Sequence, residues 1–252
     1  MTVLEAIGLH KSFGGVHAVS DVSFSVDRGE MLAMIGPNGA GKSTCFNLVG
    51  GQLRPDAGHV RLAGQDITGQ PPGLLARLGV TRTFQIAAVF ASMTVCENVQ
   101  VALTAHHRRS WRFWRAADSG FRQSSLSLLA KVDMDGQAGR AAGVLAYGDL
   151  KRLELAVALA SNPRLLLMDE PTAGMAAEER TALMALVRRL AHGSGLAVLF
   201  TEHDMDVVFG LADRILVLNR GELIAAGGAA AIRADARVRE VYLGSGTAGG
   251  DR

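Results

Sequence analysis

A glycine-rich loop that directly follows a short apolar run constrains the fold of this chain more than any other feature. Met31 to Ile35 is apolar throughout, and Gly36 to Thr44 reads G-P-N-G-A-G-K-S-T. In the pattern G-x-x-x-x-G-K-[ST], consecutive backbone N–H groups surround phosphate oxygens, and side chains at the glycines would obstruct them. The run therefore predicts a buried strand, the loop predicts a phosphate site, and a helix is expected from Lys42 to Val49, ending before Gly50.

The side chains of this loop extend the prediction to a metal ion. Lys42 would reach the β- and γ-phosphates of a nucleotide, the hydroxyl of Ser43 would ligate Mg²⁺, and the helix dipole would favour the bound anion. The residues predicted to hold the phosphates are Gly36, Pro37, Asn38, Gly39, Ala40, Gly41, Lys42, Ser43 and Thr44.

Composition limits the class of protein. The chain has 252 residues and 48% hydrophobic content, enough for one sizeable α/β unit with a subdomain. Its 26 Lys and Arg balance 24 Asp and Glu, which argues against a binder of polyanions. Cys45 and Cys96 are too few for a disulfide framework. No signal peptide is visible, and no apolar run approaches the ~20 residues that span a bilayer, so we expect action from the aqueous side of a membrane.

Hydrophobic patterning and turn residues predict the remaining elements. A capping box at Thr94 and Glu97 indicates where one helix begins, and Asn162-Pro163 indicates where another ends. Strands are predicted at Val3–Leu9, Val22–Val26, His59–Ala63, Val80–Gln85, Leu165–Met168, Leu196–Phe200, Arg214–Leu218 and Glu222–Ala226, the last two as a hairpin. Helices are predicted at Pro72–Leu78, Thr94–Thr104, Phe121–Val132, Gly148–Ser161, Ala176–His192 and Ala229–Gly244.

Polar residues follow two of the buried strands. Asp169 and Glu170 come directly after one strand, and His203 follows the next. They could be ordinary turn acids and a structural histidine. With a phosphate loop upstream, the better interpretation is that Asp169 holds Mg²⁺ and Glu170 activates water as a general base. His203 would then touch the γ-phosphate, because α/β sheets bind ligands at the carboxyl ends of their strands.

Two other stretches stay open on the residues alone. Phe13 is by default a core residue near a turn, although its place upstream of the loop also allows stacking on an adenine ring. His106 to Arg115 holds four arginines and both tryptophans. It is either a solvated loop or a contact for a partner protein, anionic lipid or nucleic acid.

In their order along the chain, these motifs resemble the ATP-binding subunit of ABC transporters over nearly the full length. Phe13 matches that family's adenine-stacking aromatic, and Gly36 to Thr44 its Walker A loop. The other matches are the Q-loop Gln85, the signature position Leu145, Ala146, Tyr147, Gly148 and Asp149, the Walker B Asp169, the catalytic Glu170 and the switch His203. A narrower resemblance, to the ATPases of branched-chain amino acid importers, rests on Arg82–Gln85, Met93–Val95, Glu97–Asn98, the signature Tyr147 and Val241–Gly244.

The resemblance implies a fold and a division of the chain. The expected fold is α/β, a P-loop NTPase (RecA-like) core with an N-terminal antiparallel β subdomain and an inserted α-helical subdomain. The expected divisions are 1–85 for the β subdomain and first part of the core, 86–158 for the helical subdomain with the signature, 159–244 for the rest of the core, and 245–252 for a disordered tail.

The resemblance also implies a function. Glu170, His203 and Gln85 would serve catalysis of ATP hydrolysis, and Ser43, Gln85 and Asp169 would hold Mg²⁺. Two ATPase subunits would sandwich each ATP between the Walker motifs of one and the signature of the other, and would drive membrane-embedded permease subunits fed by an external solute-binding protein. The chain would lie peripherally on the cytoplasmic face of the inner membrane, with no nucleic acid partner.

Three alternatives stay open: an importer ATPase for another small polar solute and, from other classes, a non-transport ABC ATPase that acts on nucleic acid and a regulatory subunit that barely hydrolyses ATP. The basic stretch favours the second, and the single Walker A loop and absence of long heptads oppose it. Glu170 and His203 oppose the third.

The signature departs from the family pattern at Ala146, where serine or proline is usual, and at Asp149, where glutamine is usual. A lost hydroxyl forfeits about 1.5–3 kcal/mol of a charged hydrogen bond. If Asp149 faces the nucleotide about 7 Å from a phosphate charge, it adds on the order of 2 kcal/mol of repulsion. The loop from Ala173 to Ala177 also lacks the usual Asp or Asn. We therefore predict a weak site at this signature and favour a heterodimer over a homodimer.

Overall fold

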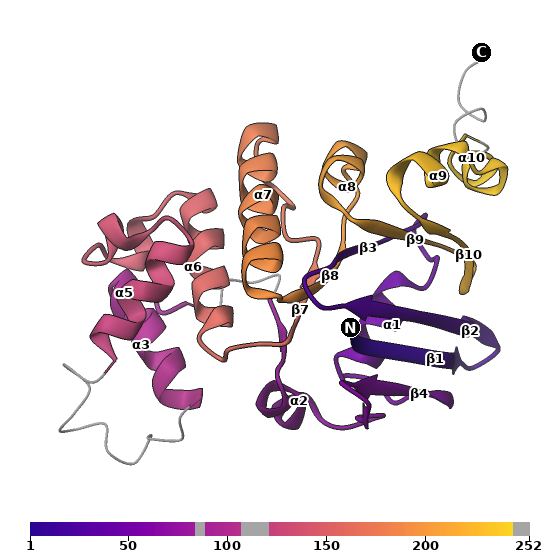
Figure 1. Cartoon of the computed structure of the whole chain (residues 1–252), viewed down its shortest axis with the longest axis horizontal. Helices are drawn as coiled ribbons and strands as arrows, with labels where there is room; N and C mark the ends of the chain where they lie inside the picture. Colours follow the sequence, from indigo (N-terminus) through magenta and orange to yellow (C-terminus); the bar gives the residue numbers. More distant parts are fainter. Residues whose placement is uncertain (84–88, 107–120, 244–252) are drawn as a thin grey trace.

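Two β-sheets organise the computed structural model, which describes residues 1–83, 89–106 and 121–243 (Figure 1). The first sheet has the order β2-β1-β4-β5, and all of its pairs are antiparallel. Its strands are β1 (Thr2–Phe13), β2 (Val16–Asp27), β4 (Ala57–Leu62) and β5 (Gln65–Asp66). The predicted antiparallel β subdomain is confirmed.

Strands β1 and β2 extend well beyond the predicted Val3–Leu9 and Val22–Val26. They form a long hairpin in which Phe13 pairs with Val16 across Gly14 and Gly15. Register shifts interrupt this pairing at several points, so the side chains lose strict alternation near the tip. Periodicity therefore marks only the regular part of each strand.

The second sheet carries the core of the fold. It has the order β10-β9-β3-β8-β7-β6, with β3, β6, β7, β8 and β9 parallel and β10 antiparallel to β9. Its strands are β3 (Met31–Ile35), β6 (Val80–Arg82), β7 (Leu165–Asp169), β8 (Ala197–Thr201), β9 (Arg214–Asn219) and β10 (Glu222–Gly227). Strand β8 thus lies between the strand that enters the phosphate loop and the strand that carries the two acids.

Both faces of this sheet are covered, which explains why β3 is apolar without alternation. All five of its residues are buried; Met31, Ala33 and Ile35 belong to one hydrophobic cluster, and Leu32 and Met34 belong to another. Figure 1 shows α7 (Ala177–Ser194) and α8 (Met205–Leu211) above the sheet, and α1 (Lys42–Val49) with the antiparallel sheet below it. A parallel sheet needs such cover on both faces.

Between β6 and β7 the chain builds a helical part that lies at one end of the molecule (Figure 1). Its elements are α3 (Val95–His106), α5 (Arg122–Lys131), the 3₁₀ turns η2 (Asp135–Gln137) and η3 (Ala142–Val144), and α6 (Tyr147–Leu159); α2 (Pro72–Leu78) precedes β6. The predicted capping box is confirmed, because the Glu97 amide donates to Thr94 Oγ1 (3.2 Å) and the Thr94 amide donates to Glu97 Oε2 (2.7 Å). The exact division at residues 86 and 158 stays a prediction.

The C-terminal stretch forms two helices rather than the single one predicted from Ala229 to Gly244. Helix α9 (Ala229–Ala234) ends before Asp235, and α10 (Ala236–Leu243) follows it. Asp235 has an extended backbone, and its carboxylate accepts from the Arg237 amide (2.8 Å), which caps α10 and interrupts the helix. The tail 245–252 lies outside the described residues. None of the described helices combines the length and the apolar character needed to cross a membrane.

Candidate nucleotide site

The glycine-rich loop connects β3 to α1 as predicted. Two of its positions require glycine because the neighbouring backbone lies too close for a side chain, and not because a phosphate must approach. A Cβ at Gly36 would lie 2.2 Å from the carbonyl oxygen of Leu218 in β9, and one at Gly41 would lie 2.4 Å from that of Ala18 in β2. Both glycines also have positive φ (154° and 101°). At Gly39 only the φ of 79° favours glycine, because a Cβ there would meet no described atom within 4 Å apart from its chain neighbours. The loop is therefore shaped by close approach to two neighbouring strands.

Lys42 fills the centre of this loop. Its ammonium donates to the carbonyl oxygens of Gly36 (2.7 Å) and Pro37 (3.1 Å), and the residue is 8% exposed. Burial lowers the pKa of Lys42, while the charges of Glu170 and Asp169 oppose that shift. The lysine and the two acids therefore share one electrostatic environment.

Asp169 at the end of β7 uses both carboxylate oxygens. Arg82 donates to Oδ2 (2.8 Å), and the hydroxyl of Thr201 donates to Oδ1 (2.7 Å). The same guanidinium donates to Asn47 Oδ1 on α1 (2.7 Å) and lies over the ring of Phe46. Arg82 and Thr201 are not among the predicted site residues; the signal that could have found Thr201 is a hydroxyl at the carboxyl end of a buried strand.

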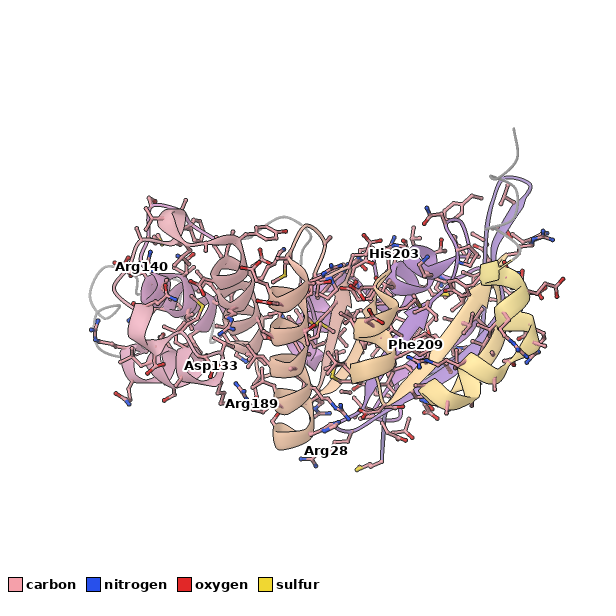
Figure 2. The ribbon with its side chains drawn as sticks, turned by 90° about the horizontal axis from the view of Figure 1, so that it is seen from above. Arg28, Asp133, Arg140, Arg189, His203 and Phe209 are labelled. Carbon is pink, nitrogen blue, oxygen red and sulfur yellow. The ribbon has the colours of Figure 1, made fainter. Side chains whose placement is uncertain are left out.

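Glu170 and His203 meet across the ends of β7 and β8. His203 Nε2 lies 2.9 Å from Glu170 Oε1, and both side chains are partly open to solvent. The Glu170 amide donates to the carbonyl oxygen (3.2 Å) and the hydroxyl (3.0 Å) of Thr201, and Glu170 itself adopts a φ of 48°. His203, labelled in Figure 2, precedes the first residue of α8 in the chain. The structure thus brings together Lys42, Asp169, Glu170 and His203, all predicted site residues.

Oxygen donors suited to Mg²⁺ are present around this loop. Ser43 is an exposed residue in the first turn of α1, and the carboxylate of Asp169 is near enough to Lys42 to influence its pKa. Mg²⁺ prefers hard oxygen ligands and takes only one or two from the protein, with phosphate oxygens and water completing the set. These residues fit the predicted ion. Gln85, the third predicted ligand, lies outside the described residues.

Phe13 stands at the tip of the β1–β2 hairpin and not in the core. Its ring is 49% exposed, with the Lys11 ammonium 5.7 Å from the ring centre. The same hairpin reaches the phosphate loop, because Ala18 of β2 packs against Gly41. The default interpretation as a core residue is therefore wrong, whereas adenine stacking stays a prediction.

The predicted signature residues surround the start of α6, in a different part of the molecule from α1 (Figure 1). Ala146 is the N-cap and offers no side-chain hydrogen bond to the helix. The Tyr147 hydroxyl donates to the Ala173 carbonyl (3.1 Å), and Asp149 Oδ2 accepts from Gln137 Nε2 (2.9 Å). Leu145 packs on the core and Gly148 lies against Glu179. One oxygen of Asp149 is thus engaged within the helical part.

Comparison with known proteins places these features in a family. The family model described as "ABC transporter" matches residues 19–173, and the one described as "Branched-chain amino acid ATP-binding cassette transporter" matches residues 222–248. The chain is 39% identical to the high-affinity branched-chain amino acid transport ATP-binding protein BraF of Pseudomonas aeruginosa, covering 96% of this chain and 98% of that one. It is 37% identical to LivG of Escherichia coli, a protein of the same description, with the same coverage.

Solved structures agree with the sequence relatives. A nucleotide-free ATP-binding cassette from an ABC transporter superposes with a TM-score of 0.82 at 31% identity, covering 96% of this chain and 99% of that one. An ATP-binding cassette in its ADP conformation gives a TM-score of 0.85 at 31% identity, covering 97% and 99%. The mixed α/β fold with its antiparallel and helical parts is therefore that of a nucleotide-binding cassette.

Proposed function

Because this chain belongs to the family of ABC transporter ATP-binding subunits, we propose that it hydrolyses Mg²⁺-bound ATP to drive import of branched-chain amino acids. The observation that carries the chemistry is the meeting of Lys42, Asp169, Glu170 and His203 at one edge of the core sheet. The observation that carries the substrate is full-length similarity to BraF and LivG, together with the matching C-terminal segment.

Each side chain has a distinct part in phosphoryl transfer to water. Lys42 and the loop amides bind the β- and γ-phosphates, and the positive end of α1 stabilises their charge. Glu170 accepts a proton from the attacking water, and the nearby His203 imidazole orients that carboxylate and contacts the γ-phosphate. Ser43, Asp169 and Gln85 would hold Mg²⁺, which would supply positive charge to neutralise the charge that develops on the phosphate.

Replacing Glu170 tests this assignment. E170Q keeps the shape of the side chain but removes the base, so ATP turnover should fall about 10²–10⁴-fold while ATP still binds. Turnover of the reconstituted transporter and equilibrium nucleotide binding would be measured together. Unchanged turnover would rule out Glu170 as the base, and a regulatory subunit would show little turnover before any substitution.

The partner that we propose is a membrane permease, docked in a groove beside β6. A cavity of about 500 Å³ opens there between α2, α3 and α6, and most of its exposed surface is apolar, with Ala76, Ala102 and Ala158 among its lining residues. Its charged lining residues are Arg77, Arg82 and Glu154, of which Arg82 is paired with Asp169 and Glu154 with Lys151. A groove of this character accepts a short amphipathic helix, and the chain would then lie peripherally on the cytoplasmic face of the inner membrane.

The second partner is another ATPase subunit, and we propose a heterodimer. The signature at α6 lies apart from α1 in the same chain, so a second subunit must complete each nucleotide site. Two solved structures of one bacterial ABC transporter cassette, 25–26% identical to this chain, are described as dimeric. Ala146 offers no hydroxyl, and Asp149 introduces a charge, which supports a weak site at this signature.

The heterodimer is tested one subunit at a time. The catalytic glutamate would be changed to glutamine separately in this chain and in its partner, within the reconstituted transporter. An asymmetric pair predicts that E170Q abolishes turnover and that the equivalent change in the partner leaves much of it. Equal loss from both changes would contradict the asymmetry.

A further inference from the structure

Glu202, the residue before His203, is a carboxylate buried at the end of β8. It is only 5% exposed, and within the described residues it forms no ion pair. Buried carboxylates that lack a cation are uncommon, because removal from water disfavours the charged form. Local hydrogen bonds stabilise the carboxylate of Glu202 in this buried position.

Three donors converge on the two oxygens of Glu202. Oε1 accepts from the Thr172 amide (3.1 Å) and from the Thr172 hydroxyl (2.6 Å), while Oε2 accepts from the His203 amide (3.2 Å). Thr172 is itself 2% exposed, so its two donors have lost water. A carboxylate fits this position because its oxygens accept hydrogen bonds, and each of the three contacts is made by a donor.

The segment that Glu202 holds includes a strained residue. Glu170 has a φ of 48°, a region that residues other than glycine seldom occupy, and it persists only where neighbouring structure fixes it. Thr201 restrains Glu170 directly, because its hydroxyl accepts a hydrogen bond from the Glu170 amide. Glu202 fixes the chain two residues further on, at Thr172. Neighbouring residues at the end of β8 thus restrain the backbone at the strained position and just beyond it.

We propose that Glu202 is a positioning residue for catalysis, which keeps Glu170 and His203 within hydrogen-bond reach. One oxygen of Glu202 binds Thr172, two residues after Glu170, and the other oxygen binds the backbone amide of His203. The 2.9 Å contact between the two catalytic side chains therefore depends on one buried carboxylate. This inference rests on the proposed role of Glu170 as the base.

The decisive variant is E202Q in the full-length chain, assayed in the reconstituted transporter. In E202Q, an NH₂ group that can only donate replaces one of the two oxygens. It then faces a donor from Thr172 or His203, so at least one of the three hydrogen bonds to residue 202 is lost. We expect kcat to fall tenfold or more while the KM for ATP stays within twofold, because nucleotide binding relies on Lys42 and the loop. E222Q, at an exposed acid of β10, is the matched control and should leave both constants unchanged.

Thr172 provides an independent arm if E202Q folds poorly. T172S keeps both donors and should retain wild-type kcat, whereas T172V removes the hydroxyl and should lower kcat as E202Q does. If the two residues act as one unit, the E202Q/T172V double variant loses little more than the worse single variant. Hydrogen exchange gives a readout besides activity: the amides of Thr172 and His203 should lose protection in E202Q while those of β3 keep it.

Several results would overturn the inference. Folded E202Q and T172V with kcat within twofold of wild type would do so, as would a raised KM with unchanged kcat. E170Q separates this failure from that of the proposed function. If E170Q abolishes turnover and E202Q does not alter kcat, only the positioning role is wrong; if E170Q keeps full turnover, the base is misassigned and this inference falls with it.

Discussion

His203 Nε2 lies 2.9 Å from Glu170 Oε1, although the two residues are 33 positions apart in the chain. They meet because β7 and β8 are parallel neighbours, with Asp169 paired to Thr201, so that the residues after each strand emerge at the same edge. A carboxylate and an imidazole in this geometry can share a proton or orient one another. The contact is the structural basis of the first prediction.

Removing the imidazole should separate binding from turnover. We expect H203A to lower ATP turnover about 10²-fold, because the carboxylate of Glu170 loses the partner that orients it. Nucleotide affinity, measured by equilibrium binding, should fall much less than turnover, because Lys42 and the loop amides still bind the phosphates. His59 is an exposed histidine that pairs with Asp66 in the other sheet, and H59A is the control. Equal losses from H203A and H59A would contradict the assignment.

The Arg82 guanidinium should be required for stability at the site. It pairs with Asp169 at 2.8 Å while the two side chains are 20% and 10% exposed, so R82A leaves a largely buried carboxylate without its cation. Removing one partner of such a pair costs about 3–5 kcal/mol. Urea unfolding of R82A would measure this loss. The control R61A, at an exposed position of β4, should stay within about 0.5 kcal/mol of wild type.

Gly41 should tolerate no side chain. A Cβ there would lie 2.4 Å from the Ala18 carbonyl at a φ of 101°, so G41A should cost about 2–4 kcal/mol through overpacking and backbone strain. Nucleotide binding should weaken as well, since the loop amides would move. G193A in α7 is the matched control. Apart from its chain neighbours and its own helix backbone, no described atom lies within 4 Å of the added Cβ, and alanine in a helix should raise the free energy of unfolding by about 0.5–1 kcal/mol. An unimpaired G41A would contradict the observed packing.

Cys45 should resist thiol reagents in the native protein. Burial raises the pKa of its thiol to about 12, so at pH 8 only about one molecule in 10⁴ carries the thiolate there. Because the folded pKa lies above the unfolded value of about 8.5, stability from this group is present below that pH and declines as pH rises toward 12. A chromogenic disulfide reagent should therefore react with Cys45 only after unfolding. Rapid native reaction at Cys45, located by mass spectrometry, would contradict this.

Much of this protein follows from local sequence. The phosphate loop, the helix from Lys42 to Val49, the capping box at Thr94 and the buried strand before Asp169 each depend on neighbouring residues, and the structure has them where the sequence predicts them. The interactions that set them are short in range: turn conformation, capping and hydrophobic periodicity. The family and the α/β class follow from the order of these local motifs.

The tertiary structure alone decided which strands are neighbours and which side chains contact each other at the site. Nothing in the sequence states that β8 lies between β3 and β7, and that order is what brings Thr201, Glu202 and His203 against Asp169 and Glu170. It also decided that Arg82 pairs with Asp169 and that Phe13 is exposed rather than buried. Strand order depends on how segments that are distant in the chain pack together. The hydrophobic patterns of strands and helices repeat every two and every three to four residues, and they carry no information about distant partners.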